Sequence, residues 1–174
     1  MLANKQIVIK DANFNHIKGC NQGCVNLFIT DAHDLETMTI TPEVEKFITL
    51  EILEHEETGL FQKVMSDIKV LSYMRLYNDL QLIPQRKGIL FEGIKVSSLY
   101  DGNNPITIDN CVNLVRNHGN NNAIDGFPWV DDMTDFVAKH SNEDIFQLSR
   151  GHDVVHGVVC RMKALLGKNP SNWG

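Results

Sequence analysis

Two histidines and a cysteine near the C-terminal end are spaced so that their side chains share one side of the chain. They are His152, His156 and Cys160, each four residues from the next. Residues four apart are neighbours on a helix, with Cβ atoms about 5–6 Å apart, and they share a face of a strand. Imidazole and thiolate groups bind transition metals and move protons. The spacing therefore predicts a site beside a cleft, or alternatively two half-buried histidines that each bond a carbonyl.

A second group of metal-ligating residue types lies in a helix that the sequence predicts from Thr41 onward. Glu51 and His55 lie one turn apart in it, and carboxylate and imidazole ligands suit Zn, Mn or Fe. If this helix packs against the last one, then Glu51, His55, His152 and His156 converge on one divalent transition metal. The paired Glu-x-x-His motifs of di-iron bundles and the His-Glu-x-x-His motif of metalloproteases are both absent.

Cys24 is a candidate nucleophile. The run Asn-Gln-Gly-Cys at 21–24 resembles the approach to the catalytic cysteine of papain-like peptidases. His156 follows at the offset of roughly 130–150 residues found in that family, with Asn169 and Asn172 beyond it. The resemblance implies that Cys24 attacks a carbonyl after His156 takes its proton. The small and aromatic residues that surround the cysteine in that family are missing here.

Arg150 and His156 form a third candidate pair. An arginine followed at this spacing by a histidine is similar to the signature of HEPN-type ribonucleases, which are helical. The resemblance implies that His156 acts as acid or base at a scissile phosphate while Arg150 stabilises its charge. Gly151 stands where that family commonly has a polar residue. The catalytic candidates are thus His152, His156, Cys24 and Arg150.

Other common catalytic and ligand-binding motifs are missing. The glycines form neither a phosphate-binding loop nor a dinucleotide fingerprint, and there is no Gly-x-Ser-x-Gly. Residues 121–132 resemble part of a calcium loop, but Pro128 interrupts it and Asp132 replaces the bidentate glutamate. The sequence therefore gives no support to ATP, NAD, serine-hydrolase or calcium chemistry.

Acidic residues are concentrated in one segment. The chain has a formal charge of −6, and residues 31–57 contain nine acidic residues and one basic residue, Lys46. Such a local field favours a docking surface for a basic protein partner, and the alternative is a solvated helix face. The charge balance argues against nucleic acid as a partner, because phosphate binding needs a positive surface.

The pattern of apolar residues predicts the elements that position these side chains. Strands are expected at 6–10 and 25–30, and a possible hairpin at 88–100. Helices are expected from Thr41 to about Glu57, from Phe61 to before Pro84, from Asp109, from Pro128, and from 152 to 166. The sum predicts an α+β fold: a helix-dominated single domain over 1–174, with a small antiparallel sheet from N-terminal and central strands.

Length and composition set the broad class. A chain of 174 residues with 43% hydrophobic and 22% charged residues is typical of one globular domain. No apolar run is long enough for a membrane span and no secretory signal is visible, so we expect a cytoplasmic protein. We expect a soluble binding or assembly protein that acts through protein–protein contacts, uses segment 31–57 for docking and self-associates. The alternative is a small hydrolase or metalloenzyme using His152 and His156 with Glu51 and His55, or with Cys24.

Overall fold

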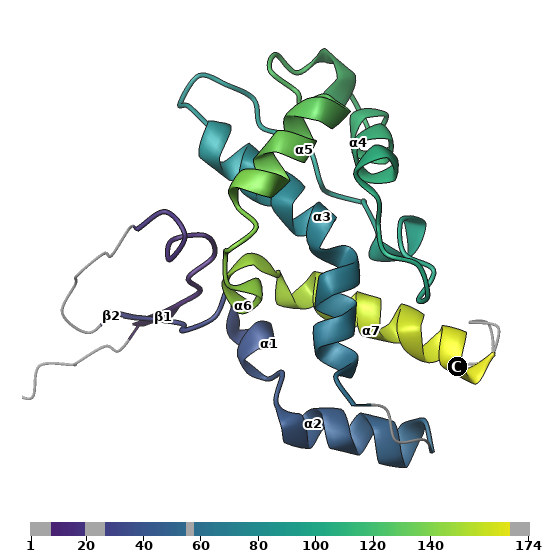
Figure 1. Cartoon of the computed structure of the whole chain (residues 1–174). Helices are drawn as coiled ribbons and strands as arrows, with labels where there is room; N and C mark the ends of the chain where they lie inside the picture. The colour runs from purple at the N-terminus through teal and green to yellow at the C-terminus, as the bar shows by residue number, and fades with distance from the viewer. Residues whose placement is uncertain (1–7, 20–26, 55–57, 168–174) are drawn as a thin grey trace, which may run out of the picture.

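The computed structural model describes residues 8–19, 27–54 and 58–167. Helices dominate this part of the chain, and two short strands lie to one side of them (Figure 1). The elements in chain order are β1 (Val8–Lys10), β2 (Leu27–Ile29), α1 (Leu35–Met38), α2 (Pro42–Phe47), the π-helix η1 (Ile48–Ile52), α3 (Leu60–Gln81), the 3-10 helix η2 (Val96–Ser98), α4 (Ile108–Arg116), the 3-10 helix η3 (Asn121–Ala123), α5 (Val130–Lys139), α6 (Ile145–Leu148) and α7 (Gly151–Leu166).

The longest helix, α3, forms the centre of the core. It packs against α4, α5, α6 and α7, and most of its side chains are buried. Its first turn is capped from outside, because the Glu45 carboxylate accepts hydrogen bonds from the backbone N–H groups of Gly59 and Phe61 at 2.8 and 3.1 Å. The helix ends before Pro84, as the sequence predicts. The interior of the protein is therefore built around one helix, which keeps an exposed polar face at Gln62, Lys63 and Lys69.

α7 crosses α3 closely, and glycine makes this approach possible. A Cβ added to Gly157 would lie 2.6 Å from Cγ1 of Val64. Val154 and Val158 are buried with Gly157, whereas Val155 and Val159 are exposed. The sequence placed Val155 and Val159 on the apolar stripe of this helix. The prediction of a helix is confirmed, but its buried face is rotated because the backbone at Gly157 replaces a side chain in the contact.

The sheet corrects the expected fold class. β1 and β2 pair in parallel, with Val8 beside Leu27 and Lys10 beside Ile29, so the predicted antiparallel sheet is wrong. Parallel pairing needs a crossover of about a dozen residues or more, and 16 residues separate the two strands in the sequence. Both strands lie inside the segments predicted as strands. The protein is thus a helix-rich fold with two short parallel strands.

The central segment 88–100 contributes no strand, although the sequence predicts extended structure there. Side-chain amides take the place of a strand partner: Ile89 N–H donates to Oδ1 of Asn78 at 2.6 Å, and Leu90 N–H donates to Oδ1 of Asn121 at 2.8 Å. Nδ2 of Asn121 also donates to the Leu90 carbonyl at 2.9 Å. The segment then turns into η2. The backbone groups of Ile89 and Leu90 thus find partners without a sheet.

The helix predicted from Thr41 to about Glu57 is shorter and less regular. Thr41 caps α2, since Oγ1 accepts the Val44 N–H at 3.3 Å, and Pro42 begins the helix as predicted. The α-helix gives way to η1 after Phe47, and Glu54 has a positive φ of 52°. Residues 55–57 lie outside the described part of the chain.

Among the described residues, no helix combines the length and the apolar character that crossing a bilayer requires.

Candidate anion-binding cleft

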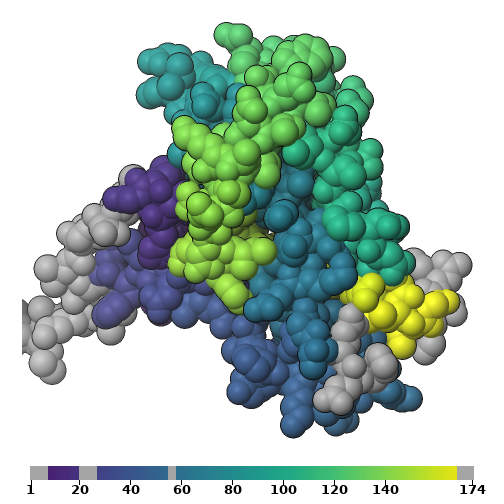
Figure 2. Space-filling view, in the orientation of Figure 1, coloured from purple at the N-terminus to yellow at the C-terminus, as the bar shows by residue number. Residues whose placement is uncertain are grey.

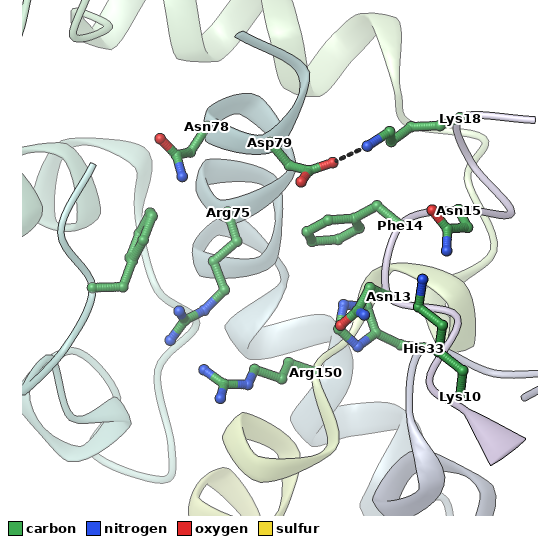
Figure 3. Close-up of a pocket in the computed structure, with 11 residues that line it drawn as sticks. Lys10, Asn13, Phe14, Asn15, Lys18, His33, Arg75, Asn78, Asp79 and Arg150 are labelled. Atoms are coloured by element: carbon green, nitrogen blue, oxygen red, sulfur yellow. Dashed lines mark hydrogen bonds and ion pairs between the residues drawn. The ribbon is translucent and has the colours of Figure 1, made fainter. Parts of the chain in front are cut away.

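A polar cleft of about 400 Å³ lies where the N-terminal segment meets α3 and the start of α7. Figure 2 shows this N-terminal segment, in purple, lying against the light green stretch of chain that connects α5 to α7. Figure 3 shows the lining side chains, which come from separate parts of the chain. They are Lys10, Asn13, Phe14, Asn15, Lys18, His33, Arg75, Asn78, Asp79, Phe91 and Arg150.

The loop after β1 is held in place by residues just after β2. Thr30 Oγ1 accepts the Ala12 N–H at 2.8 Å, and Asn13 N–H donates to the His33 carbonyl at 2.7 Å. Asn13 has a φ of 49°, in the left-handed region that asparagine tolerates better than most residues. The loop thereby places Asn13, Phe14 and Asn15 on the wall of the cleft.

His33 and Asp34 form a buried dyad on the wall of the cleft. Nδ1 of His33 lies 3.2 Å from Oδ2 of Asp34. Because an ionised carboxylate can only accept, Nδ1 carries the hydrogen and a neutral ring keeps its lone pair on Nε2. Nε2 is buried and has no hydrogen-bond partner among the described residues. The His33 side chain is 5% exposed and lines the cleft, and its ring centroid lies 4.8 Å from that of Phe14, with 78° between the ring planes.

Asp34 also joins the beginnings of two helices. Its Oδ1 accepts from the backbone N–H and Oγ1 of Thr37 at 2.8 and 2.6 Å, which caps α1. Its Oδ2 accepts the backbone N–H of Gly151, the first residue of α7, at 2.8 Å. Burial opposes ionisation of Asp34, but the hydrogen bonds from His33, Thr37 and Gly151 outweigh it and hold the pKa of this carboxyl well below its usual range.

Gly151 is required for this junction. A Cβ at this position would lie 2.4 Å from Cβ of Glu36 and 2.5 Å from Oδ1 of Asp34. Any larger residue would push α7 away from α1 and break the contact between Gly151 and Asp34. Gly151 therefore sets the position of His33 relative to Arg150, which directly precedes Gly151 in the sequence.

The cleft carries more positive than negative charge. Arg75 is neutralised by Asp153, with Nε to Oδ2 at 2.8 Å, and its guanidinium lies 4.7 Å from the centre of the Phe91 ring. Lys18 pairs with Asp79 at 2.9 Å (Figure 3).

Two further cations in the cleft, Lys10 and Arg150, are exposed. Neither side chain has an ion pair or hydrogen bond with other described residues. This arrangement is suited to an anionic group.

The structure places the predicted site residues in different parts of the molecule. His152 and His156 share an exposed face of α7, with ring centroids 4.2 Å apart, whereas Arg150 lines the cleft. Glu51 is exposed in η1. No three described residues of metal-ligating type form a group. His55 lies outside the described residues, and the four-residue metal site stays a prediction.

Two other predicted sites also stay predictions. Cys24 also lies outside the described residues, so its role as a nucleophile stays a prediction. The pairing of Arg150 with His156 is likewise untested, although Arg150 lies in the cleft and His156 is not among its lining residues.

Sequence reasoning missed the His33–Asp34 dyad. Asp34 was counted with the surface charges of segment 31–57, although its side chain is 9% exposed. The available signal was His33, which follows Asp31 by two residues and directly precedes Asp34. That signal is weak, because Gly151, whose backbone N–H holds the Asp34 carboxylate, is 117 positions away in the sequence.

No family model, no curated protein sequence and no solved structure gave a significant match to this chain.

Proposed function

We propose that the cleft binds a small oxyanion, either a phosphate or a carboxylate group, and that His33 exchanges a proton with it. Two cations in the cleft, Lys10 and Arg150, have no ion-pair partner among the described residues, in a chain whose overall charge is −6. Electrostatic attraction inside a partly enclosed cleft is stronger than at an open surface. The excess positive charge at this one place supports an anionic ligand.

His33 is the observation that carries the proposal. Its Nε2 is buried without a partner, and leaving such a group unpaired costs about 1–3 kcal/mol. Asp34 orients the ring from the other side by accepting from Nδ1. An imidazole held in this way by a carboxylate presents a defined nitrogen that accepts or donates a proton. A ligand oxygen that reaches Nε2 would satisfy it, and Lys10 and Arg150, which line the same cleft, would attract the ligand charge.

Calorimetric titration with inorganic phosphate, and separately with acetate, tests the binding step and distinguishes the two ligand types. A hydrogen bond to a charged group contributes about 1.5–3 kcal/mol, so Arg150→Ala is expected to weaken binding by about tenfold or more. The matched control is Lys69→Ala, since Lys69 is an exposed residue of α3 that does not line the cleft. Equal affinities for the wild type and Arg150→Ala would contradict the proposal.

The same titration tests the proton exchange. Repeating it in buffers with different enthalpies of ionisation shows how many protons are taken up or released on binding. We expect a buffer dependence in the wild type that disappears in His33→Gln. A buffer dependence that is the same in both proteins would assign the proton to another group.

We propose docking of a basic protein segment as a second function, because α2 and η1 expose an apolar stripe inside the acidic segment. Val44, Phe47 and Leu50 recur every three residues and are all exposed, Phe47 to 60%. Glu43 and Glu51 lie beside them. An apolar stripe bordered by carboxylates is complementary to an amphipathic helix with lysine or arginine at its edges.

A fluorescent synthetic helix of lysine and leucine is a direct probe of this second function. We expect its anisotropy to rise with protein concentration, and the affinity to fall with salt and with Phe47→Ser. Leu165→Ser, an exposed leucine of α7, is the matched control. Binding that is equally weakened by both substitutions would show non-specific adhesion instead of docking at this stripe.

A further inference from the structure

The outer face of α7 carries two histidines and two valines and is separate from the cleft. His152, Val155, His156 and Val159 follow the spacing of one helix face, and all four are exposed. Val155 and Val159 are 48% and 40% exposed. The opposite face of α7, at Gly157, packs against α3.

The two imidazole rings lie close to each other on this face. Their centroids are 4.2 Å apart, with an angle of 51° between the ring planes. Neither His152 nor His156 has a hydrogen bond to another described residue, so their nitrogens are available to an incoming ion. Neutral imidazole is a preferred ligand of Zn²⁺ and of neighbouring divalent metals.

One chain supplies only half of a zinc site from its described residues. No third histidine, cysteine, aspartate or glutamate among them joins the pair. Cys160, four residues after His156, is 9% exposed, and burial raises the pKa of its thiol, which disfavours the thiolate that binds metal. Structural zinc requires four ligands in a tetrahedral arrangement. Two coordination positions are therefore open on this face.

We propose that His152 and His156 bind a divalent transition metal, zinc in the first instance, together with the same two histidines of a second copy of the chain. A two-fold axis through the metal supplies four imidazole ligands from two identical faces. The exposed Val155 and Val159 lie on the same face, so the approach of two copies also buries apolar surface. The occupant of this face is thus a second copy, and the metal determines when it binds.

Light scattering on the full chain without a polyhistidine tag tests the proposal. Addition of Zn²⁺ is expected to double the mass from 19.7 kDa, with one zinc per two chains, and a chelator is expected to reverse the change. His156→Ala is expected to abolish the doubling. The matched control is His118→Ala, because the His118 ring already bonds the Glu92 carbonyl on another part of the surface. Both substitutions replace side chains outside the core, and circular dichroism checks that each variant is folded.

Substitution of Co²⁺ identifies the ligands independently of mass. Four imidazoles give the visible bands of tetrahedral cobalt without a thiolate charge-transfer band. A monomer that holds one zinc per chain, a doubling that persists in His156→Ala, or a thiolate band would each overturn the proposal.

Discussion

Replacing Asp34 by asparagine is the sharpest test of the junction between α1 and α7. The asparagine keeps an oxygen that can accept from Thr37, but an NH₂ group replaces the oxygen that faces Gly151 and His33. Hydrogen bonds to a charged acceptor contribute about 1.5–3 kcal/mol, and an unpaired buried N–H costs about 1–3 kcal/mol. We therefore expect the free energy of unfolding to fall by about 3 kcal/mol in urea denaturation at pH 7.

The pH dependence of this loss gives an independent check. The pKa of Asp34 is lowered in the folded state, whereas an aspartate in an unfolded chain has a pKa near 3.9. The stabilisation is thus complete well above pH 4 and declines as the pH falls below it toward the folded-state pKa. The difference in stability between the wild type and Asp34→Asn should shrink in acid.

Asp131→Asn, at an exposed position in the first turn of α5, is the control and should change stability by less than about 0.5 kcal/mol. A loss below about 0.5 kcal/mol at pH 7, or a loss that stays constant down to pH 2, would refute the reasoning.

Three further substitutions or modifications follow from close packing and burial. Gly157→Ala should lower the stability by about 1–3 kcal/mol in thermal denaturation, because the added Cβ meets Val64 at 2.6 Å; alanine normally favours a helix, so a rise in melting temperature would contradict this. Burial raises the pKa of Cys111 to about 12, so iodoacetamide at pH 8 should leave it unmodified in peptide mass mapping of the native protein. Tyr100→Phe should cost about 1 kcal/mol in urea denaturation, since the hydroxyl donates to Oδ2 of Asp67 at 2.8 Å in the core, and an unchanged midpoint would contradict it.

The long helices could be predicted from the sequence because their signal is local. In α3 the apolar residues recur every three or four positions over 22 residues, and Pro84 marks the end. The same pattern predicted α7 but not its orientation, because Gly157 contributes to the contact through its lack of a side chain. The apolar period of a helix is read from its side chains alone. It therefore assigns the buried face wrongly where the backbone at a glycine forms the contact surface.

The sheet and the cleft depend on contacts that the sequence pattern does not encode. The positions of β1 and β2 were predictable from β-branched and apolar residues, but the direction of their pairing is not set by the pattern within either strand. Two asparagine side chains, Asn78 and Asn121, replace a strand partner for the segment from Ile89 to Leu90. Nothing in the local pattern of that segment distinguishes an amide side chain from a neighbouring strand.

The position of Asp34 connects stability with the proposed site, so the two effects must be separated by experiment. Its carboxylate orients His33 and also holds the first residue of α7, next to Arg150. A variant of Asp34 that loses anion binding therefore does not show which of the two roles failed. His33→Gln leaves the bonds from Thr37 and Gly151 in place, so it should remove the proton exchange with little loss of stability. If His33 serves the ligand, phosphate should stabilise the wild type against urea more than it stabilises His33→Gln, because a ligand that binds the folded state more tightly raises its stability more at the same concentration. Equal stabilisation of both proteins would place the anion away from Nε2 and leave Asp34 with a structural role alone.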